Sequence, residues 1–390
     1  MQYQYSKQIV QCQLINTDMS LPNRTNSTNY EHPQESNLLN LHKAMEYNAQ
    51  GEPIIRTSLG SSATASDAFE RLRTTHPFTL FDSFHRYQDN GRIGIYTSGG
   101  GTSTYDTNSS SILMNVGTAS GDTVIRETNR VFAYQPGKSL QILLTFNMAP
   151  AKTNLRQRAG LFDTQNGIYL QLNDNVLSFV LRSYSSGSLV ETVVPQSEWN
   201  VTTLDGTGTS GIVLDITKSQ ILWIDVEWLG VGSVRCGFVI NGQFILCHAF
   251  HHANIGTSSY MTTACLPGRV EIVNTGATSS SSTYRQICFT VISEGGYELR
   301  GRPRSAGHQL SSPYRLSSTS TEYPILSIRL KNDRLNAIIV PKTFSIAVTS
   351  SSNFRYKLIN RGITSGGTWI SAGEDSHVEY NVSATNLSEA

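Results

Sequence analysis

The segment "CHAFHHAN" at residues 247–254 brings one cysteine and three histidines close together, and thiolate and imidazole groups are common zinc ligands. In an extended strand, successive side chains point to opposite faces. The pattern predicts one face with Phe244, Leu246, His248 and Phe250, and the other with Ile245, Cys247, Ala249 and His251. A zinc ion needs three or four convergent ligands, and only Cys247 and His251 share a face. We therefore predict hydrogen-bonded structural histidines at the end of a strand, including His252, and no metal site.

A second segment, "WIDVEW" at residues 223–228, places Asp225 and Glu227 on one face of a predicted strand. Two carboxylates about 6 to 7 Å apart could serve as an acid/base pair in glycoside cleavage. Concanavalin-like glycosidases of the laminarinase type have a similar strand, E-x-D-x-E or E-x-D-x-x-E, whose first glutamate is the nucleophile and whose last is the acid. Trp223 occupies that position here, so the group that a retaining mechanism requires is absent. We predict no catalytic residues and keep an altered polysaccharide hydrolase as a third hypothesis.

Three tryptophans between residues 199 and 228 favour a binding function instead. Trp199, Trp223 and Trp228 could stack on sugar rings, which is the basis of a lectin-like alternative. Aromatic residues in a sandwich belong to the core more often than to a ligand platform. No cofactor is predicted, because "QPGKS" at residues 135–139 lacks the first glycine of a phosphate-binding loop and precedes a strand pattern.

The charge balance also limits the partners. Charged residues make up 15% of the 390-residue chain, and 30 Lys+Arg against 29 Asp+Glu give a formal net charge of +1. Nucleic acid is therefore not an expected partner. No apolar run approaches the ~20 residues of a membrane span, and the N-terminus has no secretory pattern, so we expect a soluble protein made in a cytoplasm. Five cysteines without a CxxC motif predict small buried hydrophobes rather than a disulfide framework.

The elements that would hold these residues read as antiparallel strands. "GIYLQL" and "VLSFVLRSY" flank the turn "NDN", and Asn241-Gly242 joins "RCGFVI" to "QFILCHAF" with the residues of a type I′ turn. "HPFTLFDSFHRY" predicts a strand that alternates Phe78, Leu80 and, after a shift, Phe84, and "TSGGGTSTYDTNSSS" predicts a loop. Strands in series without intervening helices predict an all-β, antiparallel β-sandwich. The concanavalin-like jelly-roll type is what the family resemblance described below implies.

The texture of the chain predicts three parts. Residues 1–57 are polar and turn-rich, which indicates an extended N-terminal anchoring arm, and residues 58–305 carry the sandwich pattern. Pro303 and the alternate arginines of "ELRGRPRS" indicate a linker. Residues 306–390 then predict a smaller C-terminal β domain, with strands in "YPILSIRL", "AIIVPKTFSIAV" and "NFRYKLIN".

Several segments, taken in order, resemble a family of virion structural proteins of tailed bacteriophages, especially marine and cyanobacterial phages. They are "SDAFERLRTTHPFTLFDS", "GDTVIRETNRVFAYQPGKSLQILLTF", "NLRQRAGLFDTQNGIYLQL", "SQILWIDVEWLGVGSVRCGFVINGQFILCHAFHHAN" and "STYRQICFTVISEGGYELRGRPRS". The resemblance runs from about residue 57 to about residue 380. It implies a non-enzymatic particle component with a concanavalin or laminin-G type sandwich.

The leading hypothesis is therefore a structural protein on the exterior of a phage capsid or tail, of the decoration or fibre type, anchored by residues 1–57. Its expected partners are other virion proteins and further copies of itself, and the resemblance favours a trimer. Its expected location is the virion, assembled in the host cytoplasm. A host-glycan-binding attachment protein is the alternative.

Overall fold

The computed structural model describes residues 76–208, 210–318, 320–348, 354–360 and 362–388, and the paired strands β1 (Glu46–Tyr47) and β2 (Pro53–Ile54). The chain divides into two units, residues 1–74 and 75–390. Apart from β1 and β2, the predicted arm lies outside the described residues. Within them, all regular structure is β-strand except one 3-10 turn, η2 (Gln196–Glu198), which confirms the all-β class.

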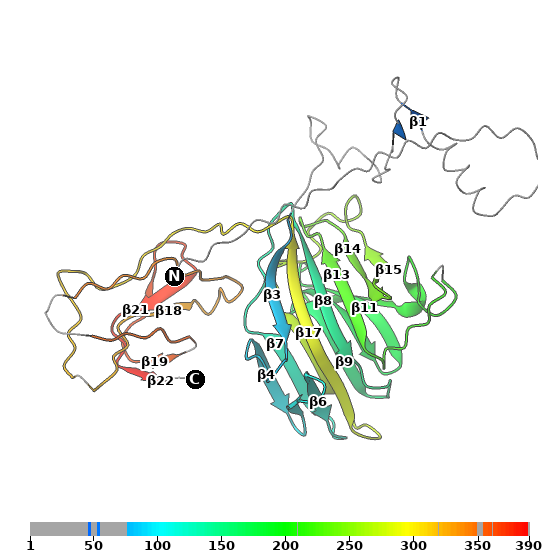
Figure 1. Ribbon diagram of the computed structural model, residues 1–390, viewed down its shortest axis with the longest axis horizontal. Helices are drawn as coiled ribbons and strands as arrows, with labels where there is room; N and C mark the ends of the chain where they lie inside the picture. Colours follow the sequence, from blue (N-terminus) through cyan, green and yellow to red (C-terminus); the bar gives the residue numbers. More distant parts are fainter. Residues whose placement is uncertain are drawn as a thin grey trace, which may run out of the picture. The chain divides into compact units, whose positions relative to one another are not determined.

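Two antiparallel sheets of the second unit share one core and form a sandwich, as predicted (Figure 1). One sheet has the order β12-β11-β10-β9-β16-β7-β4, with bounds Val190–Pro195, Val176–Ser183, Gly167–Asn173, Leu155–Phe162, Gly268–Asn274, Thr123–Thr128 and Ile93–Ser98. The other has the order β15-β14-β13-β8-β17-β6-β5, with bounds Gln243–Phe250, Val234–Ile240, Gln220–Val226, Ser139–Asn147, Ser282–Glu294, Ser111–Val116 and Thr102–Asp106. Strand β3 (Phe78–Phe84) also pairs with β17, so that three segments far apart in the sequence lie side by side in β3, β17 and β8.

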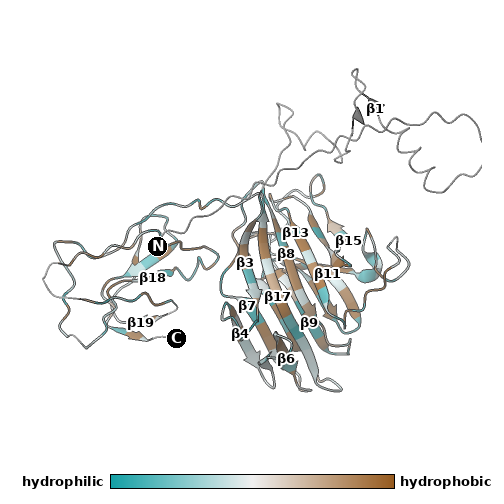
Figure 2. Cartoon of the chain, viewed as in Figure 1, coloured by the Kyte–Doolittle hydropathy of each residue, from teal (hydrophilic) through white to brown (hydrophobic). Residues whose placement is uncertain are grey.

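Strand β8 illustrates why these residues form a sandwich. Every second side chain along it is buried, namely Leu140, Ile142, Leu144 and Phe146. These meet residues of β9 in the opposite sheet, including Leu155 and Leu161, in a single apolar cluster. Figure 2 shows the resulting alternation of brown and paler residues along the strands. Each fully buried side chain of this size contributes about 1.5–3 kcal/mol to folding.

Tight turns join neighbouring strands within each sheet. The hairpin of β10 and β11 pairs Asn173 with Val176, as "NDN" predicted. The hairpin of β14 and β15 turns at Asn241 and Gly242, whose φ values are +54° and +75°. Positive φ at both positions is what a type I′ turn requires, which confirms that prediction.

The glycine tract "TSGGGTST" is only partly a loop, which corrects its prediction. Thr102–Asp106 form β5, and the three glycines carry the chain from β4 in one sheet to β5 in the other. Gly100 N donates to Oδ1 of the buried Asp122 at 2.7 Å. A Cβ at Gly101 would lie 2.1 Å from the carbonyl oxygen of Thr123, so this crossing needs a residue without a side chain.

Strand β3 forms where it was predicted, but its orientation differs. Phe81 is the phenylalanine of β3 that enters the core, whereas Phe78 and Phe84 are exposed. The register between β3 and β17 shifts between Val291 and Ile292, and such an irregularity changes which side chains point inward. The predicted alternation of Phe78, Leu80 and Phe84 was therefore wrong.

Strands after residue 294 pair only with one another in the described residues. One set has the order β18-β21-β20, with bounds Ser327–Leu330, Val378–Asn381 and Ile370–Ser371; β19 (Ile363–Ser365) pairs with β22 (Asn386–Ser388). The strand predicted from "YPILSIRL" is thus shortened to β18. The strands predicted at 337–348 and in the described part of 353–360 are absent, because their alternating apolar residues have no neighbouring strand to pair with.

No helix in the part of the chain that the structure describes has the length and apolarity needed to cross a bilayer.

Candidate functional site

The three tryptophans predicted to bind sugar are packed against other side chains. Trp199 is 4% exposed and lies 4.6 Å from the ring of Phe179. Trp223 is 6% exposed and meets Phe244 edge to face at 5.8 Å. Trp228 is partly exposed, and its Nε1 donates to Met261 O at 3.3 Å. Neither Trp199 nor Trp223 therefore presents a free ring face to a sugar.

The two carboxylates of "WIDVEW" do not face a common substrate position. Asp225 is buried near the end of β13 and forms an ion pair with Arg235 on the adjacent strand β14. Glu227 lies beyond the end of β13 and is exposed, and its Oε2 accepts a hydrogen bond from Ser233 N at 3.1 Å. Each carboxylate therefore stabilises its own local structure.

The "CHAFHHAN" segment divides its polar groups differently from the prediction. A register shift between Cys236 and Gly237 lets both Cys247 and His248 turn toward the interior, whereas His251 is exposed. The strict alternation of faces was therefore wrong, and Cys247 and His251 do not share one. Burial raises the pKa of the Cys247 thiol to about 12, which keeps it protonated and a poor metal ligand. Within the described residues, no group of three or more ligand side chains could hold a metal ion.

Each histidine of the segment has a structural partner. His248 Nδ1 accepts a hydrogen bond from Asn200 N at 3.3 Å, and its ring meets Phe250 edge to face at 4.4 Å. His252 stacks on Tyr260 at 3.9 Å, and its Nδ1 lies 2.7 Å from Gly232 O. His251 Nδ1 lies 2.9 Å from Ser233 Oγ. The histidines thus fasten this strand end to neighbouring loops.

These contacts predict a protein that loses stability in mild acid. Burial lowers the pKa of both His248 and His252 below the ordinary value of 6.5. Because the unfolded chain binds these protons first, the stability that the neutral rings contribute is present above pH ~6.5 and is lost as the pH falls. The melting temperature should therefore drop between about pH 7.5 and about pH 5.5, and the double variant His248→Asn, His252→Asn should show a flatter profile. Identical profiles for the two proteins would contradict this explanation.

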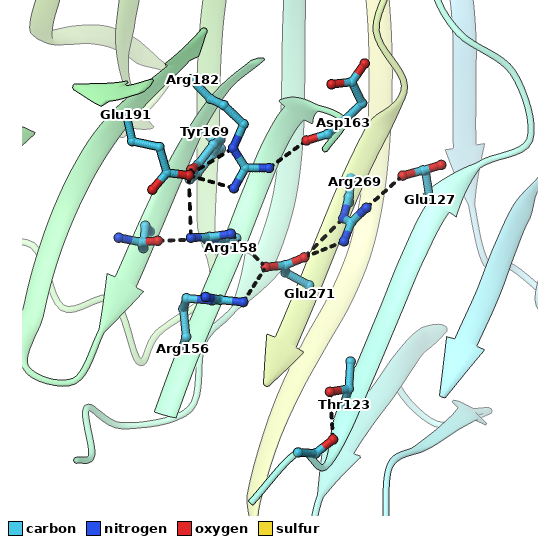
Figure 3. A network of polar contacts seen from close by, with 12 residues as sticks. Thr123, Glu127, Arg156, Arg158, Asp163, Tyr169, Arg182, Glu191, Arg269 and Glu271 are labelled. Atoms are coloured by element: carbon cyan, nitrogen blue, oxygen red, sulfur yellow. Dashed lines mark hydrogen bonds and ion pairs between the residues drawn. The ribbon is translucent and has the colours of Figure 1, made fainter. Parts of the chain in front are cut away.

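The seven-stranded sheet carries a polar network on the face opposite the core (Figure 3). The Tyr169 ring lies between the guanidinium groups of Arg158 and Arg182, at 5.0 and 5.1 Å from its centroid. Arg182 and Arg269 lie over the Phe162 ring in the same way, at 5.7 and 5.3 Å. Cations and aromatic rings thus alternate across β11, β10, β9 and β16.

Two carboxylates neutralise this network. Glu271 forms ion pairs with Arg158 and Arg269, with N···O distances of 3.3 and 2.8 Å. Glu191 forms an ion pair with Arg182 at 2.7 Å. Burial tends to raise the pKa of Glu191, but hydrogen bonds from Tyr169 and Arg182 outweigh it and hold the pKa below its usual value. Burial also raises the pKa of Tyr169, so its hydroxyl stays protonated. Neither Glu191 nor Tyr169 therefore exchanges protons near neutral pH, and we assign the network to stability.

A cluster of buried polar side chains between the two sheets anchors a loop. The sequence pattern did not single out this loop. Arg126 of β7 is buried in the sandwich, and its Nη1 and Nη2 donate to the two carboxylate oxygens of Asp89 at 2.7 and 2.9 Å. Its Nε donates to Gln286 Oε1 of β17 at 2.7 Å. His85 is also buried, with Nδ1 3.6 Å from Asp89. Burial first, and the charge of Arg126 second, lower the pKa of His85, so the ring is neutral.

We call residues 85–92 the anchored loop, because its backbone is also held from outside. Tyr105 Oη donates to His85 O at 3.0 Å, and Ser110 Oγ donates to Arg86 O at 3.4 Å. At the other end, Asn129 Nδ2 donates to Gly91 O and Asn129 N to Arg92 O, both at 3.0 Å. The loop thus has a fixed backbone while Arg86, Tyr87 and Gln88 are exposed.

These exposed side chains border an open hollow of about 550 Å³, a volume typical of small-ligand sites. We call it the loop hollow, and its lining residues are Asp82, Phe84, Arg86, Tyr87, Gln88, Asn90 and Arg92. Tyr87 is 78% exposed, and the Arg86 guanidinium lies 5.0 Å from its ring centroid. Asn90 is occupied internally, since Arg92 N donates to its Oδ1 at 3.1 Å and its amide donates to Ser83 Oγ.

An exposed aromatic ring with amide and guanidinium neighbours on a fixed backbone is suited to binding a polar, ring-shaped ligand. The ring packs against the apolar face of the ligand, and the polar groups satisfy its hydroxyls. The segment "HRYQDNGR" contains this signal, an aromatic residue among polar residues in a turn. It is too common a pattern to stand out before the anchoring of the loop is known.

No protein-family model and no curated protein matches this chain. Among solved structures, the receptor-binding domain of botulinum neurotoxin D is similar, at 12% identity and a TM-score of 0.35, over 56% of this chain and 50% of that one. The serotype D ligand-binding domain in complex with N-acetylneuraminic acid has 11% identity, a TM-score of 0.36 and coverages of 56% and 48%. The receptor-binding domain of the C/D mosaic serotype has 11% identity, a TM-score of 0.34 and coverages of 55% and 47%. The chain thus spans about half the length of these structures, and likeness at this level identifies no family.

Proposed function

We propose that this protein is a non-enzymatic binding protein that recognises saccharides through the loop hollow. The observation that carries the proposal is Tyr87, an aromatic ring that is 78% exposed, on a backbone that five side chains hold in place, those of Arg126, Asp89, Tyr105, Ser110 and Asn129. Aromatic rings exposed on a rigid framework are the usual anchors of recognition surfaces.

The chemistry of the remaining polar groups supports a non-catalytic role. Asp225 is committed to Arg235, and His248 and His252 are committed to Asn200 and Gly232. In the network of Figure 3, Glu271 is paired with Arg158 and Glu191 with Arg182. Among the described residues, the groups that could act as acid, base or nucleophile in these clusters are therefore engaged in structural contacts.

The variant Tyr87→Ala is expected to weaken saccharide binding at least ~10-fold, because it removes the stacking surface of the loop hollow. Its melting temperature should be unchanged, since an exposed side chain contributes within about 0.5 kcal/mol to stability. Calorimetric titration with the best ligand from a glycan array would measure the binding constants of the wild-type protein and of Tyr87→Ala. Tyr96→Ala is the matched control, because Tyr96 is an exposed tyrosine of β4 outside the loop hollow.

Full-strength binding by Tyr87→Ala would contradict the assignment of the site. An array without signal at high protein concentration would contradict the function itself.

We further propose that the protein acts on the exterior of a phage particle, as a decoration or fibre-type component. The support is the ordered resemblance of its segments to virion structural proteins, and the proposed anchor is residues 1–57. Mass spectrometry of separated heads and tails should find the chain in one of the two fractions.

Deleting residues 2–57 should leave a folded sandwich that no longer joins particles. Undiminished incorporation of the shortened protein would contradict the anchor.

We also propose that copies of the chain associate through the C-terminal region. Strand-like alternation at residues 337–348 leaves Ile338, Val340, Phe344, Ile346 and Val348 exposed, and no described strand pairs with them. A neighbouring copy would supply the missing partner strand and cover these side chains. The resemblance favours three copies.

The double variant Phe344→Asp, Ile346→Asp is expected to shift the protein from an oligomer to a monomer, because it places charges in an apolar contact. Light scattering coupled to size-exclusion chromatography would give the mass. Phe244→Asp is the matched control, because Phe244 is an equally exposed phenylalanine of the sandwich: Phe244 is 55% and Phe344 50% exposed. A monomeric wild-type protein at micromolar concentration would contradict the proposal.

A further inference from the structure

The charged side chains at the loop hollow differ in whether they have an ion-pair partner. Arg92 is paired with Asp82, Nη1 to Oδ1 at 3.3 Å, and it also donates to Asp82 O at 3.1 Å. The adjacent Asp89 does not contribute charge to the surface, because Arg126 binds both of its carboxylate oxygens from the interior. The charged residues that line the loop hollow are Arg86, Arg92 and Asp82, so their formal charges sum to +1.

That charge belongs to Arg86. Its guanidinium is exposed and lies over the Tyr87 ring, and no acidic residue in the described ranges forms an ion pair with it. This contact places the guanidinium close to the ring on which a sugar would lie. The fork of N–H donors of a guanidinium matches the two oxygens of a carboxylate.

Gln88 provides a further polar group that forms no hydrogen bond with the described residues. Its side chain is exposed on the rim of the loop hollow, whereas the amide of Asn90 is already bonded to Ser83 and its carbonyl to Arg92 N. A primary amide both donates and accepts, which suits the hydroxyls of a sugar ring. The groups of the site that form no hydrogen bond or ion pair with the described residues thus include the Tyr87 ring with its hydroxyl, the Gln88 amide and the Arg86 guanidinium.

From this arrangement we propose that the loop hollow selects saccharides that carry a carboxylate, of the uronic-acid or sialic-acid class. The proposal rests on the saccharide-binding function proposed above. Tyr87 packs against the sugar ring, Arg86 pairs with the carboxylate, and Gln88 binds hydroxyls. Because the whole chain has a formal net charge of only +1, the preference comes from this one contact rather than from a general positive field.

The test compares ligands that differ only in their charge. The full-length protein is titrated by calorimetry with a short oligogalacturonate and with its methyl ester, and with sialyllactose and lactose. Of the two acidic ligands, the one that the wild-type protein binds more tightly should have at least ~10-fold higher affinity than its neutral counterpart. A hydrogen-bonded pair that includes a charge contributes about a factor of 10 in affinity. Arg86→Gln should remove this difference, and Arg86→Lys should restore part of it. Arg300→Gln is the control, because Arg300 is an exposed arginine paired with Glu298 outside the loop hollow, and this variant should keep the whole difference.

The outcomes separate the two proposals. Equal affinity of the wild-type protein for acidic and neutral forms, or a difference that survives Arg86→Gln, overturns the selection of carboxylates. If neutral sugars still bind and Tyr87→Ala still weakens them, the saccharide-binding function stands without this selectivity. If none of the four ligands binds and the glycan array is also silent, both proposals are wrong.

Discussion

Replacing Arg126 with methionine should lower the free energy of unfolding by about 3–5 kcal/mol, the usual cost of removing one partner from a buried ion pair. Arg126 is almost completely inaccessible to solvent and binds both oxygens of Asp89. Burial tends to raise the pKa of Asp89, but the hydrogen bonds and charge of Arg126 outweigh it and keep the pKa below its usual value. Without Arg126, the carboxylate would remain ionised without its partner.

Chemical denaturation followed by fluorescence would measure this loss. The double variant Arg126→Met, Asp89→Asn should recover part of it, because the uncompensated charge is removed. Arg92→Met is the matched control, since the Arg92–Asp82 pair has both side chains 60% exposed and should contribute less than ~1 kcal/mol. If Arg126→Met and Arg92→Met cost the same, the buried pair does not anchor the loop.

A second large effect is expected at Glu271. The variant Glu271→Gln removes the charge that binds Arg158 and Arg269, and it leaves these guanidinium groups against the rings of Tyr169 and Phe162 without their shared carboxylate. The free energy of unfolding should fall by about 3–5 kcal/mol. The same denaturation measurement tests it.

The control for this experiment is Glu127→Gln on the neighbouring strand β7. Glu127 also binds Arg269, at 3.2 Å, but its side chain is 41% exposed, whereas that of Glu271 is 3% exposed. Solvent screening limits its contribution to less than ~1 kcal/mol. Equal losses in the two variants would show that burial does not set the strength of the network in Figure 3.

The sandwich could be predicted from the sequence because its signals are local. Alternating apolar residues in β8 and the Asn241-Gly242 turn specify a strand and a hairpin without knowledge of the rest of the chain. The side-chain orientation in β3 and β15 could not be predicted, because register shifts opposite Val291 and at Cys236 depend on the neighbouring strand.

The C-terminal strands were predicted from the same alternation and are absent for a related reason. Alternation shows that a segment is suited to a sheet, but a strand also requires a partner for its backbone. Residues 337–348 have the pattern and lack the partner among the described residues.

The loop hollow was missed because its character comes from distant residues. Tyr87 is one of 17 tyrosines and its neighbours are ordinary polar residues. Its position becomes distinctive only through Arg126, Tyr105 and Asn129, which fold onto the loop from other strands and turns. The sequence points to the tryptophans instead, because large aromatic rings can stack on sugar rings. Size favours burial as much as it favours binding, and Trp199 and Trp223 are buried.

The central claim is that the anchored loop binds saccharide without cleaving it. A crystal structure of the full-length protein with the best-binding oligosaccharide tests this most directly. We expect an intact sugar with one ring against Tyr87, polar contacts from Arg86 and Gln88, and an unchanged backbone at residues 85–92. A sugar bound elsewhere on the sandwich, a cleaved sugar, or a loop that leaves its contact with Arg126 would contradict the account.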